Sequence, residues 1–171
     1  MSFLGVVSGL VIGLVAQVLL GRLWSHVHQY LNPLTLVVII LALRGSPTAG
    51  MLSGSIAGFM QDAFSAQVLG VSSVGKTLVG YAVGAVNARF IVRSTVFLVP
   101  LIFFASAVEV AISILLDRIL EISPVLYPRS ILTVSAGNAL AGTVFIKITE
   151  RFKNRRNSAA SIARLGERTS I

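Results

Sequence analysis

Residues 41–90 read LALRGSPTAGMLSGSIAGFMQDAFSAQVLGVSSVGKTLVGYAVGAVNARF. Two apolar runs, residues 31–43 and 48–60, flank the sequence RGSP at 44–47, which is typical of a tight turn. A third apolar run, residues 74–86, follows a more polar stretch and is closed by Arg89 and Arg93. This pattern predicts a helical hairpin followed by one further helix.

Glycines recur at four-residue spacing in this stretch and near the N-terminus. The three ladders are Gly50, Gly54 and Gly58; Gly80 and Gly84; and Gly5, Gly9 and Gly13. Small residues at this spacing let two helix backbones approach closely in lipid, where no hydrophobic drive joins helices. We interpret the ladders first as packing surfaces within one bundle. A partner interface is the alternative, and a scaffold is expected to use at least one ladder for it.

The composition of the whole chain is that of a membrane protein. Hydrophobic residues make up 55% of the 171 residues and charged residues only 12%, and the mean hydropathy is +0.89. We predict an all-α polytopic bundle of about six transmembrane helices within residues 1–149. The predicted spans are residues 3–20, 31–43, 48–60, 74–86, 95–116 and 131–148. The three inner spans are short for a bilayer core of roughly 30 Å.

Basic residues predict the orientation. With both termini in the cytoplasm, ten Lys and Arg residues lie inside and four outside, as the positive-inside rule requires. Residues 150–171 are then a basic cytoplasmic tail, which we predict to be flexible because it is polar. Cytoplasmic basic candidates for contact with anionic lipid or a partner are Arg89, Arg93, Arg151, Lys153, Arg155 and Arg156.

Two polar residues fall within predicted spans. Glu109 lies midway along residues 95–116, where a bare carboxylate costs at least a few kcal/mol. Lys76 and Asn138 are its candidate partners. A relay for protons or cations usually has several titratable groups at depth, so we favour a structural hydrogen bond between helices.

Gln61 and Asp62 end the third predicted helix. An acidic residue at a helix C-terminus faces the unfavourable end of the dipole. We therefore expect Asp62 to have a local partner, either Lys76 or the N-terminus of the next helix.

No pattern for enzyme chemistry is present in the sequence. The chain has no cysteine and contains no HExxH, phosphate-loop or GxSxG motif. We predict no catalytic residue, cofactor or metal. The pI near 11.2 is explained by topology and lipid, so nucleic acid is not an expected partner.

The stretch 41–90 resembles the rod shape-determining protein MreD family. The similar features are the Gly/Pro turn, the glycine-rich helix that runs into Gln61 and Asp62, the pair Leu69 and Gly70, and the later pair Gly80 and Gly84 before a basic end. The resemblance is specific over about fifty residues and topological elsewhere. A more polar loop at 65–73 and a long tail depart from the family pattern.

This resemblance implies a non-enzymatic scaffold in the bacterial inner (cytoplasmic) membrane. MreD proteins partner MreC and connect the MreB filament to RodA and its class B penicillin-binding transpeptidase in peptidoglycan synthesis. The family's fold is similar to that of the substrate-binding subunits of energy-coupling-factor transporters. A small-molecule-binding transporter subunit is therefore the competing hypothesis. It requires several polar side chains that converge on a pocket, and few polar residues stand out within the spans.

Overall fold

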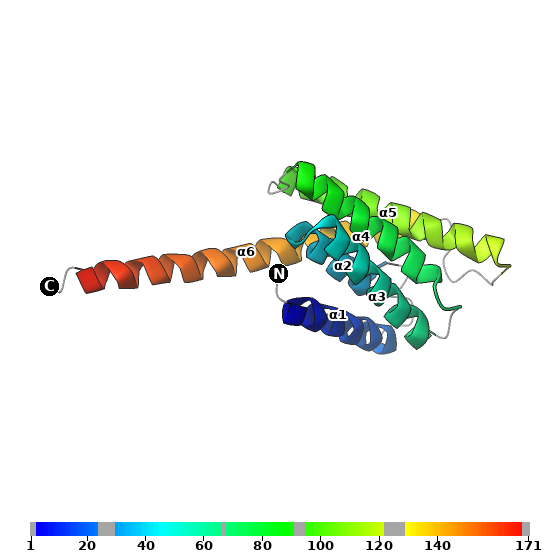
Figure 1. Cartoon of the computed structure of the whole chain (residues 1–171), viewed down its shortest axis with the longest axis horizontal. Coiled ribbons are helices and arrows are strands. Elements are labelled where there is room, and N and C mark those ends of the chain that lie inside the picture. The colour runs from blue at the N-terminus through cyan, green and yellow to red at the C-terminus, as the bar shows by residue number, and fades with distance from the viewer. Residues whose placement is uncertain (1–2, 24–29, 66–67, 91–94, 122–128, 169–171) are drawn as a thin grey trace.

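The computed structural model describes residues 3–23, 30–65, 68–90, 95–121 and 129–168. Every regular element in these ranges is an α-helix, as Figure 1 shows, so the all-α prediction is confirmed. The helices are α1 (Phe3–Leu23), α2 (Pro33–Arg44), α3 (Pro47–Ser65), α4 (Val71–Arg89), α5 (Thr95–Ile119) and α6 (Ser130–Arg168).

Helices α2 and α3 begin in the same way, with a polar cap followed by proline. The Asn32 side chain accepts a hydrogen bond from the Thr35 amide at 3.2 Å. The Ser46 hydroxyl accepts one from the Ala49 amide, also at 3.2 Å. Such caps satisfy amides that have no partner inside the helix, and proline suits the first helical position because its missing N–H is not needed there.

Helices α3 and α4 are longer than the apolar runs 48–60 and 74–86 that predicted them. Each has 19 residues, about 28 Å at 1.5 Å per residue. The apolar runs stop short of the helix ends because the extra turns carry polar side chains. The turns contain Gln61, Asp62, Ser72 and Ser73, whose hydrogen bonds hold them inside the bundle.

Three helices in the described part of the chain are long and apolar enough to cross a membrane. These segments are Leu4–Leu23, Phe97–Ile119 and Ser130–Thr149. Helix α2 is apolar but has only 12 residues, about 18 Å. Six full crossings therefore stay a prediction.

Helix α2 occupies the centre of the bundle. Its residues Leu34, Val38 and Leu41 pack with Leu10 of α1 and Ala57 of α3. The opposite side of α2 belongs to a second apolar cluster, which also includes residues of α4, α5 and α6. A short helix in this position is shielded from lipid by its neighbours, so its length does not have to match the bilayer.

Helix α6 continues far beyond the predicted span 131–148. It runs 39 residues to Arg168 and extends past the bundle in Figure 1. No proline or glycine interrupts residues 150–165, and arginine, lysine and alanine are good helix formers. The backbone has no break at the predicted boundary near residue 149, whereas the flexibility of the tail stays a prediction.

Candidate functional site

The predicted glycine ladders of α3 and α4 face one another. A methyl group placed on Gly54 would overlap the Lys76 carbonyl oxygen, and one on Gly50 would overlap the Gly80 carbonyl oxygen. A methyl group on Gly84 would lie 2.7 Å from the Pro47 Cα atom. Backbone contact of this kind excludes any side chain at these positions, which supports the packing interpretation.

The other glycine contacts also lie within the chain. A methyl group on Gly58 would overlap the Ser73 backbone, and Gly9 and Gly13 lie against side chains of α2. Gly9, Gly13 and Gly58 are therefore covered within the chain, whereas Gly5 is exposed. The α3 and α4 ladders are thus closed to a partner helix, and the use of the α1 ladder by a partner stays a prediction.

Asp62 caps the N-terminus of α4. Its carboxylate accepts hydrogen bonds from the Gly70 amide at 2.8 Å and from the Ser72 amide at 3.2 Å. Of the two partners predicted for Asp62, the structure thus selects the N-terminus of the next helix and not Lys76. A carboxylate at this position satisfies orphan amides and interacts favourably with the positive end of the α4 dipole.

Gly70 is required at the turn by its backbone conformation. Its φ of +108° is one that L-residues with a side chain rarely adopt. A methyl group at this position would have no heavy atom within 4 Å, so space does not select glycine here. Leu69 beside it is exposed. The predicted motif residues 61, 62, 69 and 70 therefore surround one turn, in which Asp62 and Gly70 bond directly.

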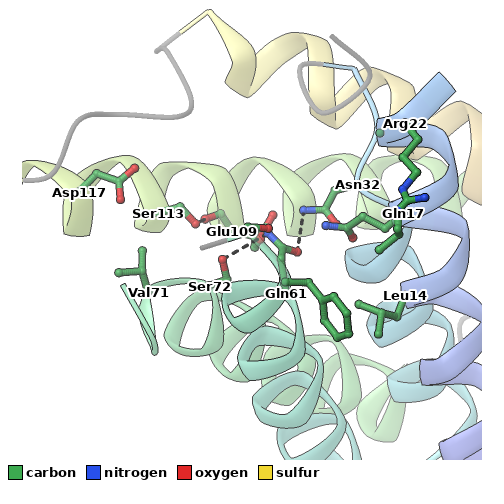
Figure 2. Close-up of a pocket in the computed structure, with 14 residues that line it drawn as sticks. Leu14, Gln17, Arg22, Asn32, Gln61, Val71, Ser72, Glu109, Ser113 and Asp117 are labelled. Carbon is green, nitrogen blue, oxygen red and sulfur yellow. Dashed lines mark hydrogen bonds between the residues drawn. The ribbon is translucent and has the colours of Figure 1, made fainter. Parts of the chain in front are cut away.

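A chain of polar contacts crosses the bundle from Gln61. The Gln61 side chain donates to the Ser72 hydroxyl at 3.2 Å and accepts from Asn32 at 3.4 Å, as Figure 2 shows. Asn138 of α6 accepts from the Asn32 amide at 2.9 Å and donates to the Ser106 hydroxyl at 3.1 Å. This chain joins α3, α4, the start of α2, α6 and α5. Asn138 therefore serves this network, whereas Glu109 has another partner.

Glu109 forms an ion pair with Lys76. The Lys76 Nζ atom donates to the Glu109 Oε1 atom at 2.5 Å, with residue exposures of 0% and 2%. Lys76 was one of two candidate partners from the sequence, and the structure selects it. The pair joins α4 to α5. The Glu109 Oε2 atom is buried and has no hydrogen-bond partner among the described residues.

A cavity of about 420 Å³ lies beside this ion pair, between α1 and α5. Figure 2 shows its lining residues, with Gln17 on one side and Glu109 and Ser113 on the other. The polar lining residues are Gln17, Arg22, Asn32, Gln61, Ser65, Ser72, Glu109, Ser113 and Asp117. The apolar part of the lining comes from Leu14, Val18, Phe64 and Val71.

The cavity corrects the expectation that few polar side chains converge within the spans. Sequence reasoning missed Gln17 in particular, although it is a buried amide in the otherwise apolar run 3–20. An uncharged polar residue at membrane depth needs a partner, and this signal could have identified it. Ser113 and Asp117 were missed because their spacing matches no known motif.

Three exposed arginines lie at the opposite end of the bundle. Asn87 donates to the Leu43 carbonyl oxygen at 2.9 Å, which brings the ends of α4 and α2 together. Arg44 and Arg89 at these two ends are exposed, as is Arg151 on α6. Arg93 lies outside the described residues, and for Lys153, Arg155 and Arg156 only the helical backbone is described. Across the described ranges, no group of three potential metal-ligating side chains is found.

Comparison with known proteins identifies the family. The family model of rod shape-determining protein MreD matches residues 1–146. No curated protein matches the chain, and no solved structure does, so the similarity to energy-coupling-factor subunits stays a prediction. The match covers all of α1 to α5 and the part of α6 that lies against the bundle. The chain belongs to the MreD family of rod shape-determining membrane proteins.

Proposed function

We propose that this protein is a membrane scaffold of the cell-elongation machinery. It binds MreC and, directly or through MreC, links MreB to the RodA and class B penicillin-binding transpeptidase complex. Family membership implies the role in rod shape determination, and the partners are our inference from that role. The observation that carries the proposal is the family match over residues 1–146, because it includes the whole helical bundle.

The exposed faces of the outer helices are the proposed contact surfaces for MreC. Helix α1 packs against α2 and α3 only among the described helices. Leu4, Ile12 and Leu19 on α1 are more than half exposed. The glycine ladders of α3 and α4 are filled within the chain, so the proposal places the MreC transmembrane helix on the apolar face of α1.

The basic end of the bundle is the proposed cytoplasmic side of the inner membrane. Arg44, Arg89 and Arg151 would lie there together with the tail, and both termini would be cytoplasmic. The long α6 helix would then carry the basic residues of the tail away from the bundle, toward MreB or anionic headgroups.

Photo-crosslinking in the native membrane tests the proposal. A photoreactive amino acid replaces Ile12 on α1, or Leu140 on α6 as a matched exposed control. The tagged protein is then purified and its partners are identified by mass spectrometry. We expect an MreC adduct from position 12. Absence of MreC from both the adducts and the co-purified proteins would overturn the scaffold function.

The cavity favours a second candidate function, a small-molecule-binding subunit of a transporter. Its volume of about 420 Å³ falls in the range of small-molecule sites. Recovery of an ATPase module without MreC in the same purification would favour this function over the scaffold.

A further inference from the structure

We propose that the cavity between α1 and α5 binds a neutral, hydroxylated group, contributed by a free sugar or polyol or by a hydroxylated lipid head group. This site does not depend on the scaffold function proposed above. It rests on the hydrogen-bonding state, burial and charge of the side chains that line the cavity.

Two buried oxygens beside the cavity lack a hydrogen-bond partner among the described residues. They are Gln17 Oε1 on α1 and Glu109 Oε2 on α5, and both residues line the cavity. Gln17 is 6% exposed and Glu109 is 2% exposed. A buried acceptor without a donor costs about 1–3 kcal/mol. Two such acceptors at one cavity indicate a bound group that supplies hydrogen-bond donors.

The helices that carry these acceptors do not pack against each other. Helix α1 contacts α2 and α3, whereas α5 contacts α2, α4 and α6. The two unpartnered oxygens cannot satisfy each other, because both are hydrogen-bond acceptors. A group held between α1 and α5 can donate to both sides.

Ser113 adds a third polar group next to Glu109. Its hydroxyl donates to the Glu109 carbonyl oxygen at 3.1 Å, so its own oxygen remains able to accept a hydrogen bond. The three acceptors Gln17, Glu109 and Ser113 favour a ligand that carries more than one donor.

The balance of charge among the residues around the cavity favours a hydroxylated ligand over a cationic one. The charged residues described in the lining are Arg22, Glu109 and Asp117. Lys76 pairs with Glu109, so the charged lining residues and this lysine together amount to two cationic and two anionic groups. An ammonium group would add an uncompensated charge, whereas hydroxyl groups donate without one.

The apolar lining suits the remaining surface of such a ligand. Leu14, Val18 and Phe64 line the cavity beside the polar groups. The C–H faces of a sugar ring, or the glycerol carbons of a lipid, would lie against them. A cavity with polar and apolar parts of this kind matches the general character of small-molecule sites.

Ligand-dependent thermal unfolding of the full chain tests the site. The protein is reconstituted in nanodiscs of phosphatidylethanolamine, and maltose is titrated from the aqueous phase. In a second arm the uncharged glycolipid monoglucosyldiacylglycerol is added to the nanodisc, and in a third arm choline chloride is the cationic probe. A ligand that binds only the folded protein raises the unfolding midpoint with its concentration. The apparent Kd follows from this dependence.

Gln17→Leu is the test variant and Ser8→Ala is the control on the exposed side of α1. We expect maltose or monoglucosyldiacylglycerol to raise the midpoint of the wild type and of Ser8→Ala. Gln17→Leu should weaken the apparent Kd about tenfold, which corresponds to the loss of one good hydrogen bond. Without a probe its midpoint should stay level or rise, because the substitution removes a buried acceptor that has no donor.

The arms separate the outcomes. A response to maltose identifies a free sugar or polyol as the source, and a response to monoglucosyldiacylglycerol identifies a lipid head group. A response to choline alone, the absence of any response, or an unchanged Kd in Gln17→Leu would overturn the proposal. If Gln17→Leu does not fold, Ser113→Ala gives the same comparison. None of these readouts involves MreC, so failure of the site is distinguishable from failure of the scaffold function.

Discussion

Removal of Lys76 should destabilise the bundle more than any surface substitution. Lys76→Met keeps most of the side-chain volume but removes the charge that pairs with Glu109 at 2.5 Å. Both side chains are almost fully buried, so the carboxylate gains little hydration when its partner is lost. The carboxylate is left in the interior with two oxygens that lack a donor among the described residues, because Oε2 already lacks one.

The expected loss follows from the burial of the pair. Removing one partner of a buried ion pair costs about 3–5 kcal/mol, because the remaining charge is uncompensated. Replacing both partners by apolar residues of similar size is often neutral or stabilising. We therefore expect Lys76→Met and Glu109→Leu each to lose about 3–5 kcal/mol of unfolding free energy, and the double variant to lose about 1 kcal/mol or less.

Denaturant titration in detergent micelles, followed by far-ultraviolet circular dichroism, measures these differences. Lys147→Met is the matched control because Lys147 is exposed, and we expect its unfolding free energy to stay within about 0.5 kcal/mol of the wild type. The double variant gives the coupling energy of the pair. A loss below about 1 kcal/mol for Lys76→Met, or a double variant as unstable as the two single variants combined, would refute the reasoning.

Three further predictions concern the α3–α4 unit. Gly54→Leu should lower the unfolding midpoint in detergent far more than Ala63→Leu on the exposed side of α3, because any side chain at 54 overlaps the α4 backbone; equal midpoints would contradict the packing. Gly70→Ala should lower the unfolding free energy by about 1–2 kcal/mol, because residue 70 has a φ of +108°. Gly75→Ala is the control, since its methyl group meets ordinary contacts of 3.4 Å or more and should be neutral or stabilising. Chemical denaturation of both variants measures the difference. Asp62→Asn keeps one acceptor for the two α4 amides and should cost about 1–2 kcal/mol while leaving membrane insertion intact. Normal cell shape together with normal MreC recovery in an Asp62→Asn strain would show that this cap is dispensable.

Much of the fold could be predicted because lipid restricts what a backbone can do. Apolar runs gave six helices, and the four-residue glycine spacing gave the close approach of α3 to α4. The apolar runs 48–60 and 74–86 stop short of the ends of α3 and α4, because Gln61 and Ser72 look like loop residues in a hydropathy pattern. Inside the bundle each satisfies the other at 3.2 Å. A polar residue therefore indicates the end of a helix only where the fold offers it no hydrogen-bond partner inside the bundle.

The candidate site could be predicted from the sequence less well than the fold, because its contacts depend on tertiary structure. The sequence showed that an unpaired Glu109 carboxylate would cost free energy at membrane depth, and it offered Lys76 and Asn138 as partners. Helix register alone could not choose between them, because the choice depends on which faces of α4 and α6 lie against α5. The structure assigns Lys76 to Glu109 and Asn138 to Asn32 and Ser106.

By itself, the sequence determined that this protein is a helical membrane protein, where close packing occurs and which family it resembles. Those properties follow from composition and from spacing along one helix. Only the tertiary structure determined that Gln17 and Glu109 line one cavity. The two residues are far apart in the chain and lie on helices that do not touch. The packing of α2, α3 and α4 fixes the positions of α1 and α5, and so it places Gln17 and Glu109 on either side of the cavity.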